Sequence, residues 1–190
     1  MNTKNTTEIP DRLLDAAEAL IYQHGLNATG MEQIVKKTGI ARKTIYRYFS
    51  NKDDLCAQAL QHRDKRWMRW FEESSCVSDS PEACLLAMFD ALKSWFQTED
   101  FRGCAFINSA GETADPHHPV RVIAKEHKVN ILRFITRLAE KAHAKTPQAL
   151  ANQLLVLIDG AITVAMLMGN PAAADDAKET AKVLINSQIN

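Results

Sequence analysis

The segment from Gly39 to Phe49 (GIARKTIYRYF) constrains the fold more than any other part of the chain. Ile45 and Phe49 are four residues apart, and Ala41 precedes Ile45 by four. A helix here would therefore place three apolar side chains on one face. The other face carries three cations and a tyrosine: Arg42, Lys43, Tyr46 and Arg47. So short a helix is not stable alone, because its few hydrogen bonds do not offset the cost of nucleation. It must lean its apolar side on neighbouring helices and leave its basic side exposed.

The residues before Gly39 supply such a neighbour. Met31, Ile34 and Val35 have helical spacing in a segment that ends near Thr38. Gly39 then provides a turn, where a positive φ costs glycine little. A short helix, a tight turn and a short basic helix form a helix-turn-helix, whose second helix enters the DNA major groove.

The charge distribution agrees with a nucleic-acid face. The whole chain has no net charge, with 23 basic and 23 acidic side chains. Residues 28–52, however, hold six lysines and arginines against the single acid Glu32, whereas residues 67–190 hold 12 basic and 15 acidic residues. A local basic patch on a neutral molecule is typical of a protein with one DNA-binding surface.

The same stretch resembles the N-terminal domain of TetR-type transcriptional regulators over roughly residues 10–66. The resemblance is carried by Ala28, Thr29, Met31, Ile34, Gly39, Ile40, Thr44, Ile45, Tyr46, Tyr48, Phe49, Lys52 and Leu55, all with intact spacing. It implies phosphate contacts from Thr29, Tyr48 and Lys52, and phosphate or base contacts from Thr44 and Tyr46. It also implies that the variable positions Arg42, Lys43 and Arg47 select the operator sequence.

The rest of the chain shows helical periodicity throughout, which predicts an all-α protein of about nine helices. We expect a flexible arm over residues 1–9 and a first helix beginning at Pro10, which suits a first helical turn. A helix-turn-helix domain should span residues 10–52, with a fourth helix from about residue 52 connecting it to an effector-binding and dimerisation domain over residues 53–190. That fourth helix ends in aromatic residues, which should enter a second core.

Aromatic side chains in the second domain are candidates for an effector pocket. The motif from Arg102 to Asn108, followed by Glu112 and Asp115, resembles one branch of TetR regulators. The alternative to a pocket is that these aromatic residues only fill the core and that Asn108 caps backbone. The predicted pocket residues are Trp67, Trp70, Phe71, Phe89, Trp95, Phe106, Asn108 and His127.

The last two predicted helices indicate a homodimer. Residues 154–168 are apolar nearly all round, so one side of that helix needs a partner. The following helix carries an alanine stripe that would allow close helix approach. These features predict a four-helix bundle between two copies, as in TetR-type dimers; the alternative is a monomer that buries this helix in its middle. The predicted interface is Leu154, Ile158, Ile162, Ala174, Ala177, Ala181 and Leu184.

Other functions have less support in the sequence. An enzyme would have to use Asp159, His127 and Cys104, which lie far apart and outside any known catalytic motif. A metal sensor would use His117, His118, His127 and the cysteines, and a redox sensor Cys104 or Cys76. We expect no metal, no cofactor and no catalysis.

The sequence thus predicts a cytoplasmic repressor that binds a palindromic DNA operator as a homodimer. A small, largely apolar effector would release it; the alternatives are a redox- or metal-responsive regulator that uses cysteine or histidine residues, and a DNA binder without a ligand. Residues 1–9 are polar and the apolar tract ending at Met168 is shorter than 18 residues, so neither a secretory signal nor a membrane span is expected.

Overall fold

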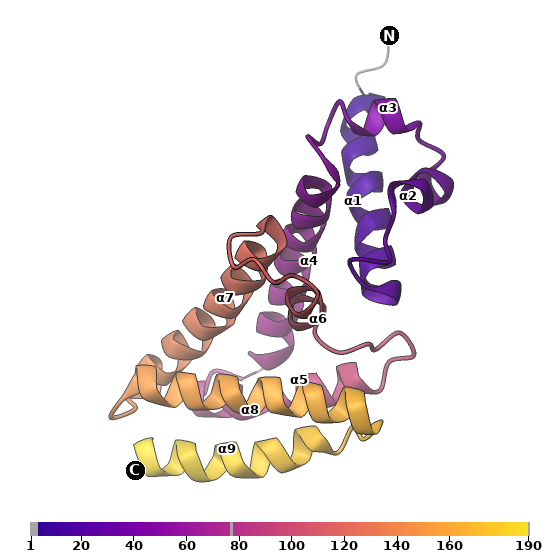
Figure 1. Cartoon of the computed structure of the whole chain (residues 1–190). Coiled ribbons are helices and arrows are strands. Elements are labelled where there is room, and N and C mark those ends of the chain that lie inside the picture. Colours follow the sequence, from indigo (N-terminus) through magenta and orange to yellow (C-terminus); the bar gives the residue numbers. More distant parts are fainter. Residues whose placement is uncertain (1–3, 77, 190) are drawn as a thin grey trace. The chain divides into compact units, whose positions relative to one another are not determined.

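The computed structural model describes the backbone of residues 4–76 and 78–189, and the side chains from residue 9 onward within those ranges. This part of the chain contains nine helices and no strand (Figure 1), which confirms the predicted all-α fold. The helices are α1 (Lys4–His24), α2 (Met31–Thr38), α3 (Arg42–Ile45), α4 (Lys52–Ser75), α5 (Pro81–Phe96), α6 (Ala105–Gly111), α7 (Pro119–Lys141), α8 (Pro147–Met168) and α9 (Ala173–Ile189).

The first helix begins earlier than predicted. Helix α1 starts at Lys4 and contains Pro10 in its interior. Proline lacks the amide hydrogen for one bond to the preceding turn, so it weakens a helix without always ending it. The prediction of a flexible arm over residues 1–9 falls partly on residues 1–3, which lie outside the described residues, while residues 4–9 are helical.

The chain forms two compact units, and α4 and α7 contribute residues to both. Unit 1 comprises residues 1–66 and 105–127, and unit 2 comprises residues 67–104 and 128–190. Packing therefore joins α6 and the start of α7 to the helix-turn-helix segment. The predicted functional boundary at residue 52 is a different kind of division and stays a prediction.

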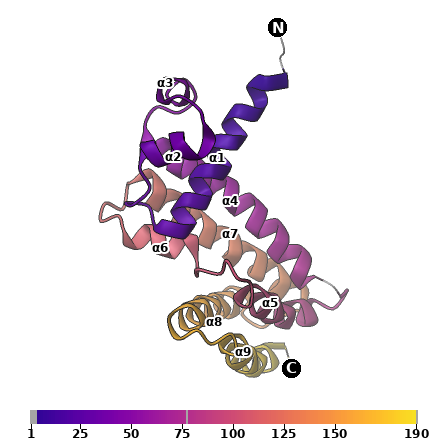
Figure 2. The ribbon, with the colours of Figure 1, turned by 90° about the vertical axis from the view of Figure 1, so that its right-hand side faces the viewer.

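Unit 1 is organised around α1, on which α2 and α6 pack, with α3 packed on α2 (Figure 2). Its core combines residues from the first four helices with Phe49, which follows α3. Helix α1 ends at a left-handed glycine, with Gly25 at φ +92° and Leu26 buried directly after it. The core residues are Leu13, Ala17, Leu20, Met31, Ile34, Ile45, Phe49, Leu55 and Ala59.

Unit 2 is built from α5, α8 and α9, which pack on one another, together with the ends of α4 and α7. Helices α8 and α9 lie side by side (Figures 1 and 2). Phe71 and Met68 at the end of α4 are buried here, while Trp67 and Trp70 are half-buried. The aromatic end of α4 therefore enters a second core, as its composition predicts.

Candidate nucleic-acid interface

The turn between α2 and α3 is fixed by backbone and side-chain hydrogen bonds. The Gly39 amide donates to the Val35 carbonyl (2.8 Å), and Gly39 has φ +71°, the conformation that favours glycine. The Thr38 hydroxyl donates to the Ile34 carbonyl (2.8 Å) and accepts from the Ile40 amide (3.2 Å). Arg12 of α1 donates to the Thr38 carbonyl (2.9 Å). The end of α2, and with it the start of α3, is therefore held firmly.

Helix α3 is a single turn that is anchored by two apolar side chains. Ile45 is fully buried and Phe49 is 3% exposed. The chain continues after α3 with tight turns, in which the Arg47 and Tyr48 amides donate to the Thr44 and Ile45 carbonyls. The expectation that Ala41 shares this apolar face is wrong: Ala41 is the exposed, extended N-cap residue, so it lies outside the helical register.

Four of the predicted DNA-binding residues lie exposed on one segment. Arg42, Lys43, Tyr46 and Arg47 are all exposed, Tyr46 by 42%. The Arg42 guanidinium donates to the Tyr46 hydroxyl (3.4 Å), and this hydrogen bond raises the pKa of Arg42. The cation therefore persists at any physiological pH. Thr44 and Tyr48 are half-buried, and Tyr48 packs on the core of unit 1.

Thr29 and Lys52 are engaged within unit 1. Thr29 is fully buried and its hydroxyl donates to the Gly25 carbonyl (2.7 Å), so this side chain does not belong to the exposed surface. The Lys52 ammonium is half-buried and donates to the Leu26 carbonyl (3.2 Å). An ammonium group has three donors, so Lys52 retains the capacity to donate to an anion.

The start of α4 has a polar cap. The Asn51 side chain accepts from the Asp54 amide (2.8 Å), as expected of a residue preceding the helix. Asp54 accepts from both the amide and the hydroxyl of Ser50 (2.8 and 2.9 Å) and from Gln58 (2.8 Å). The bond from Gln58, followed by that from the Ser50 amide, lowers the pKa of Asp54. This cap fixes the chain where it leaves the recognition segment.

The predicted effector residues fall into two groups. Trp67, Trp70, Phe71 and Trp95 contact one another in unit 2, with ring centroids 4.7–6.2 Å apart, and Phe89 is buried in the same unit. In unit 1, the buried Phe106 ring stacks on His127 at 3.7 Å, and Nδ1 of His127 lies 2.7 Å from Asp64. Asn108 is half-buried on α6. The aromatic residues thus fill space against one another.

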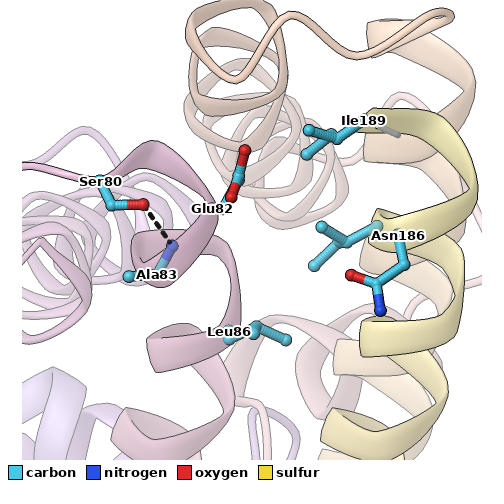
Figure 3. A pocket seen from close by; sticks show the side chains of 7 residues that line it. Ser80, Glu82, Ala83, Leu86, Asn186 and Ile189 are labelled. Carbon is cyan, nitrogen blue, oxygen red and sulfur yellow. Dashed lines mark hydrogen bonds between the residues drawn. The ribbon is translucent and has the colours of Figure 1, made fainter.

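A pocket of about 270 Å³ lies elsewhere in unit 2, between the start of α5 and the end of α9 (Figure 3). None of the eight predicted effector residues lines it. Apolar and polar side chains share its surface, and the Ser80 hydroxyl at its edge caps α5 by accepting from the Ala83 amide. Its lining is Ser80, Glu82, Ala83, Leu86, Ile185, Asn186 and Ile189.

The predicted interface residues of α8 and α9 are mostly occupied within the chain. Six of the seven (Leu154, Ile158, Ile162, Ala174, Ala177 and Ala181) are buried, because α8, α9 and α5 pack on one another, and Leu184 is half-buried. The six buried side chains are covered by other helices of the same chain, and the dimer interface itself stays a prediction. The apolar side chains that remain exposed on this pair of helices are Val156, Val164, Leu167, Met168 and Val183.

Helix α8 is the one helix among the described residues that is long and apolar enough to cross a membrane. Core helices of soluble proteins have the same property. Here α8 packs on α5 and α9, and its Asp159 pairs with Lys128 (2.6 Å). These contacts show that one side of α8 is packed within the chain.

The residues considered above for a catalytic, metal-binding or redox function make contacts of other kinds in the structure. Asp159 and Cys104 both contact Lys128, whose ammonium lies 3.6 Å from the thiol, whereas His127 pairs with Asp64 in the other unit. His118 lies beside Asp53 (3.5 Å). Burial raises the pKa of the exposed Cys76 to about 11, with a further contribution from its hydrogen bond with Cys84. At neutral pH Cys76 is therefore a protonated thiol of low reactivity.

Among the described residues, one group has the spacing of a metal site: Asp15, Glu18 and His62. Its carboxylates are already paired with cations, since Arg63 and Arg66 both bond to Glu18 and Arg66 also bonds to Asp15. A divalent ion would have to displace or face these guanidinium groups. The group is therefore an ion-pair network that joins α1 to α4.

Sequence reasoning missed Glu112 as a structural partner of the helix-turn-helix. Its carboxylate accepts from the Leu26 amide (2.8 Å) and the Asn27 amide (2.7 Å), which belong to the turn between α1 and α2. The only signal was its place in the motif that begins at Arg102, because no local pattern indicates a contact over 86 positions.

An exposed basic helix held by a fixed turn on a buried apolar anchor defines a helix-turn-helix DNA-binding protein. Comparisons with known proteins agree. Residues 13–59 match the family described as "Bacterial regulatory proteins, tetR family", and residues 81–181 match "Tetracyclin repressor-like, C-terminal domain". The chain therefore belongs to the TetR family of transcriptional regulators.

Individual relatives support this assignment over nearly the whole chain. The chain is 29% identical to the uncharacterised HTH-type regulator YxaF of Bacillus subtilis over 94% of this chain and 92% of that protein. Over a shorter stretch, 52% of this chain and 48% of that protein, it is 34% identical to the HTH-type transcriptional repressor ComR of Escherichia coli. The crystal structure of SCO4454, a TetR-family regulator of Streptomyces coelicolor, superposes with a TM-score of 0.87 at 26% identity, covering 97% of each chain. TetR regulators are in general not enzymes.

Proposed function

We propose that this regulator is a cytoplasmic repressor that binds a palindromic operator as a homodimer and is released by a small, largely apolar effector. The observation that carries the DNA part is the exposed set Arg42, Lys43, Tyr46 and Arg47, set on the buried anchors Ile45 and Phe49. The name of ComR as a repressor supports the direction of control.

Within this set, the arginines are the candidates for reading bases. A guanidinium can bond to guanine O6 and N7 at once, which discriminates by about 1–3 kcal/mol per contact. Thr44, Tyr48 and Lys52 are better suited to phosphates, because they are half-buried next to the exposed residues. We do not propose a DNA contact for the Thr29 side chain, because it is buried and its hydroxyl donates to the Gly25 carbonyl.

The test of this proposal is operator binding. Fluorescence anisotropy would be measured with labelled DNA from upstream of the protein's own gene, against a scrambled duplex of equal length. Specific binding should exceed non-specific binding by a factor of about a thousand or more at physiological salt. Equal affinity for both duplexes would refute sequence-specific regulation by this DNA.

We propose that two copies form a homodimer through the exposed apolar side of α8 and α9, called here the free face. Val156, Val164 and Leu167 follow one another at helical spacing on α8 and are 71%, 41% and 74% exposed; Val183 on α9 is 68% exposed. Such large exposed apolar side chains, gathered on two adjacent helices, are typical of an interface. The proposal thus keeps the predicted helices but moves the interface to the side that the chain itself leaves uncovered. Sedimentation equilibrium at micromolar concentration should give twice the 21.2 kDa of the chain.

The effector is proposed to bind beside the aromatic cluster of unit 2. Trp67, Trp70 and Trp95 are half-buried, so they offer both apolar surface and access. All three tryptophans of the chain belong to this cluster, which makes their emission a direct probe. A library of small apolar compounds should contain members that shift the emission and release operator DNA. If no compound does either, the protein is a DNA binder without this control.

A further inference from the structure

The Glu112 carboxylate closes the turn that leads into the helix-turn-helix. Its two oxygens accept separately from the Leu26 and Asn27 amides at 2.8 and 2.7 Å, and the Asn27 side chain donates to the Glu112 carbonyl (3.4 Å). Hydrogen bonds to an ionised acceptor are stronger than those between neutral groups. Three bonds from one residue therefore join the C-terminal end of α6 to the turn between α1 and α2.

The turn is shaped for this contact. Gly25 has φ +92°, and a Cβ atom at this position would lie only 2.8 Å from Oε1 of Glu112. Glycine therefore serves two purposes here: it adopts the left-handed conformation that ends α1, and it leaves room for the carboxylate. A side chain at residue 25 would push the carboxylate away from the amides.

The segment that carries Glu112 is itself braced. Arg121 of α7 donates to the carbonyls of Ala110 (3.3 Å) and Thr113 (3.1 Å), on either side of Glu112. His118, just before α7, lies 3.5 Å from Asp53 in the first turn of α4. Movement of α6 within unit 1 would therefore pull on the turn after α1 and on the start of α4.

The other end of α6 is tied to unit 2. Gly103 and Cys104 directly precede α6 and belong to unit 2. Gly103 has φ +79°, and a Cβ atom there would lie 2.3 Å from the Met166 sulfur of α8, so it packs tightly. The Cys104 thiol lies 3.6 Å from the Lys128 ammonium. The seven residues of α6 thus connect packed residues of one unit directly to Glu112 in the other.

The turn between α1 and α2, which Glu112 holds, also positions Lys52, a predicted DNA contact. The Leu26 amide donates to Glu112, and the Leu26 carbonyl accepts from the Lys52 ammonium (3.2 Å). A shift of Leu26 would therefore change the position of Lys52. We propose that Glu112 is a positioning residue that transmits changes between unit 2 and the operator-binding segment through α6. This inference rests on the proposed function, because it assumes that the protein binds its operator.

The test uses operator DNA as the ligand and the three tryptophans, all in unit 2, as the reporter. Linkage requires that a signal passing from unit 2 to the DNA face also passes in the reverse direction. Operator binding should therefore change the tryptophan emission of the wild-type protein. Glu112→Ala should still bind operator through the exposed basic set, more weakly because Leu26 no longer holds Lys52 in place, and at saturating DNA it should lose the change in emission. Glu112→Gln keeps the size of the side chain and one acceptor oxygen, so it should retain about half of the two carboxylate bonds and a reduced response.

Glu126→Gln is the matched control, since Glu126 is an exposed acid on α7 in the same unit. It should show the wild-type emission change. Circular dichroism would establish whether each variant is folded. If Glu112→Ala does not fold, the emission change of Glu112→Gln is the test. A full emission change in the Glu112 variants, or none in the wild type despite operator binding, would overturn the inference. Absence of operator binding in the wild type would instead refute the proposed function.

Discussion

Helices α3 and α8 present opposite problems to anyone reading the sequence. In α3 and the turns that follow it, the apolar Ile45 and Phe49 are buried and the basic side chains between and before them are exposed, so polarity marks both sides. In α8, apolar residues occur on every side, yet only one side is buried in the chain: Leu154 and Ile158 are fully buried, whereas Val156 is 71% exposed. Polarity therefore locates a functional face on an amphipathic helix, but on a uniformly apolar helix only the three-dimensional packing does.

The largest expected effect is the difference between placing a charge on the buried side and on the exposed side of the α8–α9 pair. Ala181→Arg places a charge where the side chain is fully buried, and removing a charge from water without a partner costs several kcal/mol. This variant should not fold. Val156→Arg places the same charge on the exposed side, where it should leave the fold intact and dissociate the dimer through repulsion across the two-fold axis. Thermal melting and sedimentation would be measured for both.

Lys182→Arg serves as a control, because Lys182 is exposed on α9 and the substitution keeps its charge. It should resemble the wild type in both measurements. A folded Ala181→Arg monomer together with a dimeric Val156→Arg would show that the interface lies where the sequence placed it, and that our assignment of the free face is mistaken.

The same contrast explains how much could be predicted from the sequence. The order of the helices, their ends at Gly25, Gly39 and Gly169, and the anchors Ile45 and Phe49 all follow from local patterns, because caps and periodicity act within a few residues. The burial of Thr29 and the contacts of Glu112 do not, because they depend on residues brought together by the fold. The side of α8 that the chain leaves exposed could not be predicted for the same reason, since it depends on where α5 and α9 pack.

The second effect concerns the α3 face itself. Arg47→Ala should weaken operator binding by about 1–3 kcal/mol and relax the preference at one base position, because a guanidinium that reads a base carries sequence information. Lys52→Ala should weaken binding to all DNA sequences alike and reduce the salt slope by about one, as expected of a phosphate contact. Anisotropy titrations at several salt concentrations, with operator and scrambled duplexes, would distinguish the two. Identical behaviour of both variants on both duplexes would contradict these roles.

The third effect tests the polar cap that follows the α3 face. Asp54→Ala removes the acceptor of Ser50 and Gln58, which should lower the free energy of unfolding by about 1 kcal/mol at pH 7. Since the pKa of Asp54 is lowered in the folded protein, its contribution is complete above the unfolded pKa of about 4 and is lost as the pH falls through the lower folded value. Urea unfolding should therefore show a difference between wild type and variant that shrinks below pH 4. An unchanged difference at pH 3, or an equal loss in Asp11→Ala on the exposed side of α1, would refute this assignment.

The smallest effect is expected at two of the four cysteines, Cys56 in unit 1 and Cys76 in unit 2. Burial raises the pKa of both Cys56 and Cys76 to about 11, although Cys56 is buried and Cys76 exposed. At pH 8 only about one molecule in a thousand would carry the thiolate at either site, because each pH unit below the pKa reduces it tenfold. Iodoacetamide labelling followed by peptide mass spectrometry should show slow modification of Cys76 that accelerates about tenfold per pH unit up to pH 10, and almost none of Cys56 until the protein unfolds. Rapid, pH-independent labelling of Cys76, accompanied by loss of operator binding after mild peroxide that Cys76→Ser prevents, would instead favour a redox-responsive regulator.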